Sequence, residues 1–164
     1  MPADFIVRSI ETSDREKVKQ LVTEWWGDQF IVVHGAFFFP HQLPGFMAVS
    51  ARSTIEGLAT YSIDGRSCEM ITLNTTSEKK GIGSALFRAV VHAAQKAECS
   101  RMWLITTNDN LNALGFYQKR GMTLVAVHQG AVERSRALKP SIPTIGANGI
   151  PIRDEIELEL LLGA

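Results

Sequence analysis

The feature that most constrains the fold is a change of hydrophobic period at a glycine turn in the middle of the chain. Three runs rich in apolar and β-branched residues precede the turn, at 46–50, 54–63 and 67–73. Asp64-Gly65 predicts a tight hairpin between the last two runs. After Gly81-Ile82-Gly83, the alanine-rich run 84–98 repeats apolar side chains at helical spacing. The pattern predicts an antiparallel meander of three strands that leads through the turn into a helix.

The remaining elements place this unit in a larger mixed sheet. A strand at 5–8 comes first, followed by a helix that we expect to begin at a Ser13–Glu16 capping box and to end at Gly27. The aromatic-rich segment 28–45 is broken by glycine and proline and predicts no long element. The later runs predict a strand at 102–106, a helix at 110–119, a strand at 122–128, a short helix at 131–139 and a last strand at 156–160. This order predicts an α/β fold with a mixed sheet and helices on both faces.

Size and charge narrow the function classes. The 164 residues suit a single domain spanning 1–164, with 129–153 as an extra helix and loop before the last strand. Seventeen basic and seventeen acidic side chains cancel, so a broad nucleic-acid-binding face is not expected. The first ten residues contain charges and lack a long apolar run, which predicts no membrane span and a cytoplasmic protein. Two cysteines give no disulfide framework, and His34 and His41 lack further ligands at metal-binding spacing, so no metal is expected.

The glycine turn is suited to holding a phosphate group. Glycines let the backbone approach an anion, and the following helix presents free N–H groups at its positive end. The turn lacks the Gly-Lys-Ser/Thr of a Walker loop, and Leu86 stands where a dinucleotide fingerprint needs a third glycine. Two interpretations remain open from the residues alone: a pyrophosphate site, or a tight turn into a helix.

A second motif follows the strand at 102–106. Asn110, Ala113 and Tyr117 are three and four residues apart, so they share one face of the predicted helix, and Phe116 precedes the tyrosine. Ala113 is small enough to let a ligand lie close, and Tyr117 would bring a phenolic proton to the same place. The alternative is a helix N-cap at Asn110 and an aromatic pair in the core.

Together, in this order, the two motifs resemble the GNAT superfamily of N-acetyltransferases. The cofactor loop of that family, Arg/Gln-x-x-Gly-x-Gly/Ala, is matched by Gly81 and Gly83, and its Asn-x-x-Ala-x-x-Phe-Tyr helix is matched at all four places from Asn110 to Tyr117. The similarity in element order runs from about residue 5 to residue 128. Glu78 departs from the pattern, since the family usually has arginine or glutamine there.

The resemblance implies acetyl-CoA as co-substrate, bound where two parallel strands splay apart. It implies that backbone groups near Ile71 and Leu73 pair with the pantetheine arm, and that Asn110 contacts the same arm. Tyr117 would lie beside the sulfur and protonate the departing thiolate. The pyrophosphate would be held by Lys79, Lys80, Gly81, Ile82, Gly83 and Ser84.

Glu69 is the candidate for the catalytic base. It lies on the strand that leads to the cofactor, and simple alternation puts it on one face with Ile71 and Leu73. An apolar setting there would raise the pKa of its carboxyl and suit it to accept a proton. The alternative is a carboxylate at a strand end that is exposed or paired with an arginine.

Acceptor binding is assigned less specifically. Trp26 and His34 are candidates because they lie in the aromatic segment where such proteins often shape the acceptor pocket, although core packing also explains the aromatic residues. Glu155, Glu157 and Glu159 alternate along the last strand. We interpret them as a solvated acidic face rather than as a site that attracts a cationic amine. The alternation predicts that this strand lies at the edge of the sheet or is exposed on one face. Such a strand would allow pairing across a homodimer.

The function predicted from these residues is transfer of an acetyl group from acetyl-CoA to a primary amine of a small molecule or protein. Two alternatives belong to other classes. One is a non-catalytic acyl-CoA sensor that retains the cleft, and the other is a protein-interaction module with a vestigial cleft. Neither nucleic acid nor membrane is expected as a partner.

Overall fold

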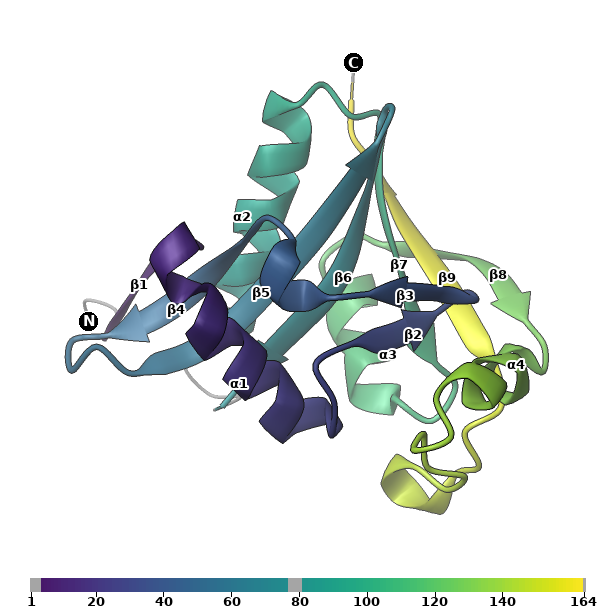
Figure 1. Cartoon of the computed structure of the whole chain (residues 1–164). Helices are drawn as coiled ribbons and strands as arrows, with labels where there is room; N and C mark the ends of the chain where they lie inside the picture. Colours follow the sequence, from purple (N-terminus) through teal and green to yellow (C-terminus); the bar gives the residue numbers. More distant parts are fainter. Residues whose placement is uncertain (1–3, 77–80, 164) are drawn as a thin grey trace.

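The computed structural model describes residues 4–76 and 81–163 and is built around a seven-stranded sheet (Figure 1). The strand order is β1-β4-β5-β6-β7-β9-β8. The strands are β1 (Phe5–Ser9), β4 (Gly45–Ser50), β5 (Ile55–Asp64), β6 (Ser67–Thr75), β7 (Arg101–Thr107), β8 (Thr123–His128) and β9 (Glu155–Leu161). Every neighbouring pair is antiparallel except β6 and β7, which confirms the predicted mixed, mostly antiparallel sheet. Glu78, Lys79 and Lys80 lie outside the described residues.

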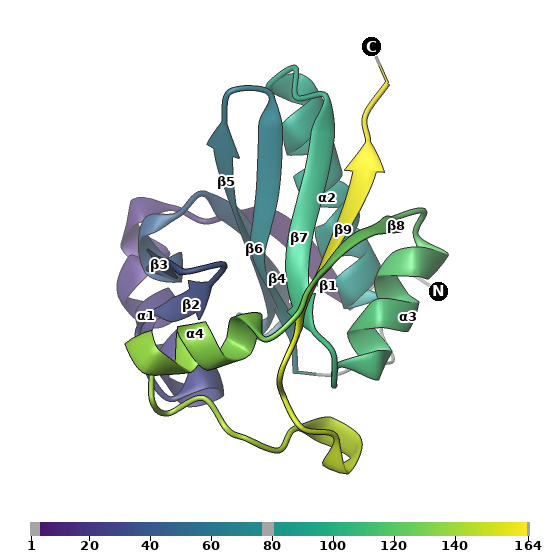
Figure 2. The same cartoon turned by 90° about the vertical axis from the view of Figure 1, so that its right-hand side faces the viewer.

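Helices cover both faces of the sheet, as predicted. They are α1 (Arg15–Trp26), α2 (Ile82–Lys96), α3 (Leu111–Lys119) and α4 (Ala131–Leu138). On one face, Leu86 and Val90 of α2 pack in a core that includes Met102 of β7. On the other, Val18 of α1 packs in a second core that includes Leu58 of β5. Figure 2 shows α1 on one side of the strands, with α2 and α3 on the opposite side.

The parallel strands β6 and β7 separate part of the way along their length. Their register covers three pairs, Ser67 with Arg101, Cys68 with Met102 and Glu69 with Trp103. Both strands continue beyond that point, β6 to Thr75 and β7 to Thr107. From residue 70 onward β6 is paired with β5 alone, so the backbone groups on its other edge have no strand partner among the described residues.

A β-bulge in β6 overturns the predicted side-chain pattern of that strand. Thr60 lies opposite Thr72, but Tyr61 lies opposite Met70, which leaves Ile71 as an extra residue. A bulge of one residue reverses the alternation that follows it. Leu73 therefore packs against the α2 core, whereas Glu69 faces the other side of the sheet. The expectation that Glu69 and Leu73 share a face is wrong, because a simple alternation cannot anticipate the bulge.

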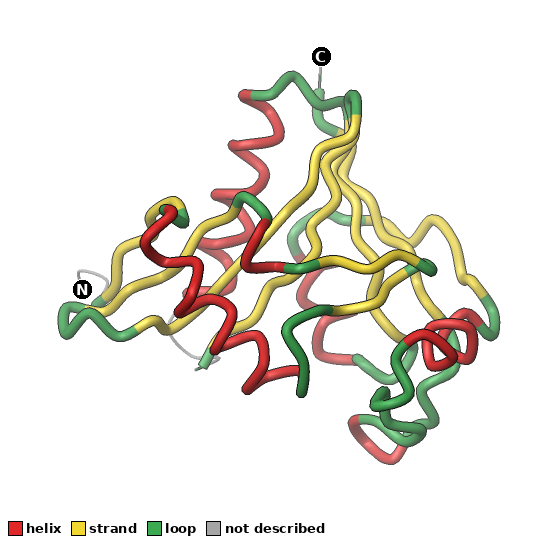
Figure 3. Tube along the Cα trace, viewed as in Figure 1, coloured by secondary structure: helices red, strands yellow, loops and turns green. Residues whose placement is uncertain are grey.

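A short hairpin lies in the segment for which no long element was predicted. Its strands are β2 (Ile31–Val33) and β3 (Ala36–Phe38), and a 3₁₀ turn, η2 (Pro40–Gln42), follows. Figure 3 shows the hairpin as two short strands joined by a tight turn, and it shows the segment between α4 and β9 as mostly loop around the turn η3 (Ala147–Gly149). The hairpin crosses the α1 side of the sheet near β6 and β7 (Figures 1 and 2).

The last strand is not at the edge of the sheet. β9 is hydrogen-bonded to β7 on one side and to β8 on the other, so the edge-strand alternative is wrong. β8 is the edge strand on this side of the sheet, and it exposes apolar side chains, with Leu124 51% and Val127 64% accessible. Among residues 4–76 and 81–163, no helix has the length and apolar character needed to cross a membrane.

The first helix begins differently from the prediction. A 3₁₀ turn, η1 (Thr12–Asp14), precedes α1, and Ser13 does not cap it. Asp14 instead accepts a hydrogen bond from the backbone N–H of Glu11 at 2.7 Å and pairs with the Arg8 guanidinium at 2.7 and 2.9 Å. Asp14 satisfies the local backbone and a charged partner at once, which Ser13 cannot do.

This arrangement predicts a pH-dependent contribution to stability. The Arg8 guanidinium lowers the pKa of Asp14 from 3.8 to about 2. A lowered carboxyl pKa stabilises the fold at neutral pH, and the contribution is lost as the pH falls through the folded-state pKa. Because Arg8 is partly exposed, we expect Asp14→Asn to lower the free energy of unfolding by about 1 kcal/mol near pH 7. The deficit should shrink between about pH 4 and pH 2.

Urea unfolding at a series of pH values measures this effect. Asp64→Asn is the matched control, because Asp64 lies in the exposed β5–β6 turn and asparagine serves equally before glycine there. A deficit in Asp14→Asn that stayed constant down to pH 2 would contradict the assigned role of the carboxylate.

Candidate active site

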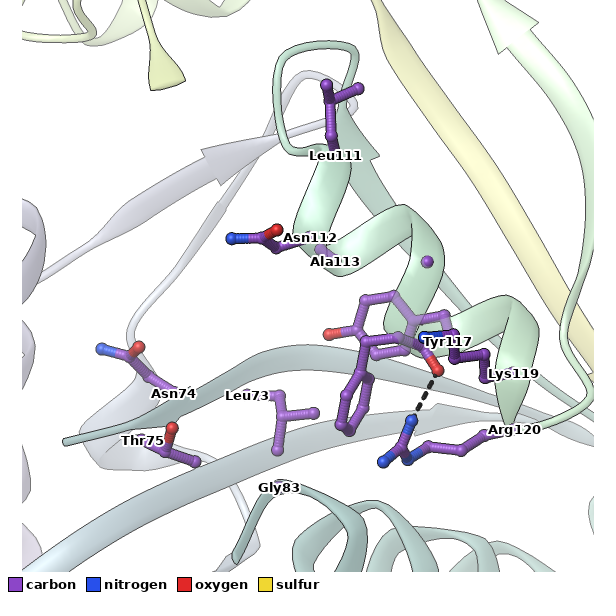
Figure 4. Close-up of a pocket in the computed structure, with 12 residues that line it drawn as sticks. Leu73, Asn74, Thr75, Gly83, Leu111, Asn112, Ala113, Tyr117, Lys119 and Arg120 are labelled. Atoms are coloured by element: carbon purple, nitrogen blue, oxygen red, sulfur yellow. Dashed lines mark hydrogen bonds between the residues drawn. The ribbon is translucent and has the colours of Figure 1, made fainter. Parts of the chain in front are cut away.

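A groove opens on the α2 and α3 side of the sheet, where β6 leaves β7 (Figure 4). It has a volume of about 640 Å³. Its walls come from the end of β6, the first turn of α2 and the length of α3. The lining residues are Leu73, Asn74, Thr75, Gly83, Leu111, Asn112, Ala113, Gly115, Phe116, Tyr117, Lys119 and Arg120. The two sequence motifs, which lie about 30 residues apart in the chain, therefore meet at one site.

The predicted glycine turn forms the start of α2. Gly81 is the N-cap with φ of 73°, a left-handed conformation that favours glycine. The N–H groups in the first turn of a helix have no intrahelical acceptor, so they are free to meet an anion. A Cβ added at Gly83 would lie 3.2 Å from the ring of Phe116, which shows how closely α2 and α3 approach here. Ile82 has its side chain in the core, so only its backbone is available to a ligand.

Arg120 is a component of this groove that the sequence analysis missed. Its Nε donates a hydrogen bond to Oγ of Ser84 at 3.1 Å. Its Nη1 donates to the carbonyl of Phe116 at 2.9 Å, the bond marked by the dashed line in Figure 4. The guanidinium also lies 3.5 Å from the centre of the Phe116 ring. The first turn of α2 therefore has a fixed cation beside it. The sequence signal was the Lys119-Arg120 pair at the end of the motif helix.

Tyr117 and Asn110 have different surroundings. Tyr117 is 8% exposed, lines the groove and packs edge-on against Phe116, with ring centroids 5.3 Å apart. Burial raises the pKa of its phenol well above the usual value near 10. Asn110 caps α3, because its Oδ1 accepts from the N–H of Ala113 at 3.4 Å while its amide donates to Thr106 at 3.2 Å. The N-cap alternative for Asn110 is thus present, and its contact with a cofactor stays a prediction.

Glu69 and His34 form a pair where β6 and β7 part. The Oε2 of Glu69 lies 2.7 Å from Nε2 of His34, and Glu69 is 7% exposed. Glu69 and Trp103 are the last residues paired between the two strands, and the His34 ring lies over Trp103 with centroids 5.4 Å apart. The hydrogen bond that the imidazole makes to the Glu69 carboxylate raises the pKa of His34. Both residues are candidates from the sequence, but their contact with each other was not predicted.

His34 is held in an unfavourable backbone conformation. It occupies the turn of the β2–β3 hairpin with φ of 40°, followed by Gly35 with φ of 75°. Left-handed backbone is uncommon for a residue with a side chain, and asparagine or glycine is usual in such hairpin turns. The backbone N–H of His34 donates to Oε2 of Glu155 at 3.1 Å. Strained residues of this kind cluster at functional sites, where their surroundings hold them in place.

The acidic side chains of β9 face the same region as His34. Glu157 pairs with Arg101 at 3.0 Å and with His128 at 3.0 Å, and Glu159 pairs with Arg101 at 2.8 Å. Glu155 is 4% exposed. The interpretation of all three as a solvated acidic face is therefore wrong. They belong to a polar network on the face of the sheet opposite α2.

The extra segment after β8 is tied to the loop before the hairpin. The buried Lys139, at the end of α4, donates its Nζ to the carbonyl of Phe30 at 2.9 Å and to that of Trp26 at 3.4 Å. Burial lowers the pKa of this amine. Trp26 packs against the α1 core and edge-on against Trp25, so its proposed contact with an acceptor stays a prediction. Within residues 4–76 and 81–163, no group of three or more potential ligands could hold a metal ion.

Comparison with known proteins identifies the family. The sequence model described as the Acetyltransferase (GNAT) family matches residues 10–122. The uncharacterized protein YdhI of Bacillus subtilis is 46% identical over 147 residues, which cover 87% of this chain and 92% of that protein. YxbD of the same organism, also uncharacterized, is 38% identical over 144 residues, which cover 88% of this chain and 91% of that protein.

Solved structures share the fold. An IAA acetyltransferase from Bacillus cereus has a TM-score of 0.73 at 20% identity, with 96% of this chain and 99% of that chain covered. A GNAT family acetyltransferase from Elizabethkingia anophelis with acetyl-CoA bound has a TM-score of 0.67 at 17% identity, with coverage of 97% and 99%. These likenesses concern the fold, and the family match concerns the sequence. This chain belongs to the GNAT family of acetyltransferases.

Proposed function

We propose that this protein is an N-acetyltransferase that transfers the acetyl group of acetyl-CoA to a primary amine of a small molecule or a protein. One observation carries the proposal. β6 and β7 separate directly after Glu69 and Trp103, with a groove for the donor on one side of the sheet and the Glu69–His34 pair on the other. A donor and a proton acceptor on opposite sides of one opening suit a direct attack of the amine on the thioester.

The groove fits a donor that carries phosphates. The first turn of α2 offers backbone N–H groups, and Arg120 and Lys119 add positive charge beside them. The unpaired edge of β6 beyond Glu69 offers backbone groups to an extended amide-bearing arm, which adds to the sheet as a further strand would. Gly81, Gly83 and Ser84 keep the roles expected for them in this proposal.

The chemistry assigns a separate task to each side chain. Acetyl-CoA supplies an activated carbonyl carbon. With Nε2–H donating to Glu69, the Nδ1 atom of His34 carries the lone pair and accepts the proton of the acceptor ammonium. The freed amine forms the nitrogen–carbon bond as the carbon–sulfur bond breaks. Tyr117, which burial keeps protonated at neutral pH, donates its hydroxyl proton to the leaving sulfur. The amine nitrogen loses a second proton as it becomes the amide, and that proton restores the Tyr117 hydroxyl. The products are the N-acetylated amine, the free thiol and the proton that His34 passes to solvent.

Donor binding is tested through Arg120. We expect Arg120→Ala to weaken acetyl-CoA binding about tenfold, because hydrogen bonds from a charged donor beside the α2 terminus are lost. Isothermal titration calorimetry measures the change. Lys96→Ala, at the opposite end of α2, removes a positive charge from the same helix and should bind like wild type.

Turnover separates the proposal from the sensor alternative. Release of free thiol is followed in the presence of primary amines, and mass spectrometry identifies the N-acetyl product. Acetyl-CoA binding without acetylation of any amine would favour a sensor. Absence of acetyl-CoA binding by the wild-type protein would overturn the donor site itself.

A further inference from the structure

A second cavity lies on the opposite face of the sheet from the donor groove. We propose that it is the acceptor site and that it takes a small primary amine carrying a carboxylate, that is, an amino acid. This inference rests on the proposed function, because it names the substrate class of the same active site. The cavity is enclosed by the hairpin turn, β7, β9 and α4, and it has a volume of about 470 Å³. Small-molecule sites commonly have such volumes.

The position of the cavity joins it to the proposed proton acceptor. His34 and Trp103 both line it. His34 is hydrogen-bonded to Glu69, and Trp103 lies opposite Glu69 in the pairing of β6 with β7. An amine held in this cavity therefore lies next to the opening between β6 and β7. The apolar walls include Ile105 and Leu138, which suit the hydrocarbon part of a small acceptor.

Glu155 supplies the group that would hold the ammonium. Two carboxylates line the cavity, and Glu157 already has side-chain partners, an ion pair with Arg101 and a hydrogen bond with the His128 ring. Glu155 is 4% exposed and has no cationic side-chain partner among the described residues. Its Oε2 accepts the backbone N–H of His34, whereas Oε1 has no hydrogen-bond partner within the described part of the chain. Oε1 is not sealed from solvent, so the ammonium of an acceptor in the cavity can reach it and donate to it.

Arg134 supplies the group that would hold the carboxylate. It projects from α4, is exposed, lines the cavity and forms no ion pair with the residues that the structure describes. Its neighbour Arg136 is instead committed to Glu133 and to the carbonyls of Ile142, Pro143 and Ile152. A guanidinium matches a carboxylate in charge and in the spacing of its donors. A second ammonium on the acceptor would meet the like charge of Arg134, so a diamine is disfavoured.

Matched acceptors test the proposal. L-leucine is compared with L-leucinamide, and γ-aminobutyrate with butylamine, so that each pair differs in the carboxylate; putrescine represents a diamine. We expect kcat/KM to be at least about tenfold higher for the member with the carboxylate. Arg134→Glu should abolish or invert that preference. Arg52→Glu makes the same charge change in the exposed turn between β4 and β5 and should leave the ratio unchanged.

The outcomes separate this inference from the proposed function. Equal use of the two members of each pair, a preference for putrescine, or a ratio unaffected by Arg134→Glu overturns the acceptor class and leaves N-acetyl transfer in place. Acceptor binding is also measured by calorimetry on protein saturated with CoA. Leucine binding that Arg134→Glu removes, without turnover, supports the site and refutes N-acetyl transfer to this acceptor. If leucine and γ-aminobutyrate are neither bound nor acetylated, the inference is overturned.

Discussion

Replacing Glu69 with glutamine is expected to lower kcat for amine acetylation by about 10²- to 10⁴-fold, the usual contribution of general acid–base catalysis. The substitution keeps the shape of the side chain beside His34 but removes the charge that stabilises the protonated imidazole. Steady-state thiol release at saturating acetyl-CoA measures the loss. Glu159→Gln is the matched control, since Glu159 lies on the same face, directly opposite Trp103, and its side chain pairs with Arg101.

The pH dependence distinguishes a role in proton transfer from a role in folding. His34 must be unprotonated to accept a proton, so the rate should rise as the pH passes through the pKa of its imidazole. Glu69 raises that pKa through the hydrogen bond to Nε2. In Glu69→Gln the rising limb should therefore move to lower pH while the plateau falls. A lower plateau with an unmoved limb would remove Glu69 and His34 from proton transfer.

Tyr117→Phe is expected to lower kcat about a hundredfold while the affinity for acetyl-CoA changes little. Phenylalanine keeps the ring that packs against Phe116 and Phe87, and it removes the hydroxyl that would protonate the leaving sulfur. Calorimetry and steady-state kinetics together separate the two effects. The other tyrosine of the chain, Tyr61, packs against the same core and stacks on Phe46, so Tyr61→Phe should retain wild-type kcat. Wild-type kcat in Tyr117→Phe would refute the assignment of the acid.

Local patterns were enough to predict the framework of the fold. Strand, turn and helix signals are short-range, so the meander, the glycine turn that leads into α2 and the helix from Asn110 to Lys119 follow from neighbouring residues. The two motifs that carry the resemblance meet in a groove at the split between β6 and β7, which we propose as the donor site. These are the parts of the site that are encoded in continuous segments.

The features that were missed depend on contacts between distant segments. His34 and Glu69 are 35 residues apart, and only the folded hairpin brings them together. The bulge at Ile71 comes from the pairing of β6 with β5, and it reverses the side of the sheet that Leu73 occupies. The three carboxylates of β9 resemble a solvated face in sequence, yet β9 is paired on both sides and covered by the hairpin turn near Glu155.

The contact of Lys139 has a consequence for exchanging parts between relatives. Its ammonium joins the end of α4 to the carbonyl of Trp26, the last residue of α1, and to that of Phe30, in the loop that leads into the hairpin. The helix α4 also contacts β2. A graft of segment 131–153 from a relative, without segment 26–38, would bring together segments that are not matched at this contact. Either a buried amine of the graft or the carbonyls of Trp26 and Phe30 would then lack a partner, at a cost of about 1–3 kcal/mol for each unsatisfied group. The two segments therefore form one exchangeable cassette, and altering the acceptor range by recombination requires that they be moved together.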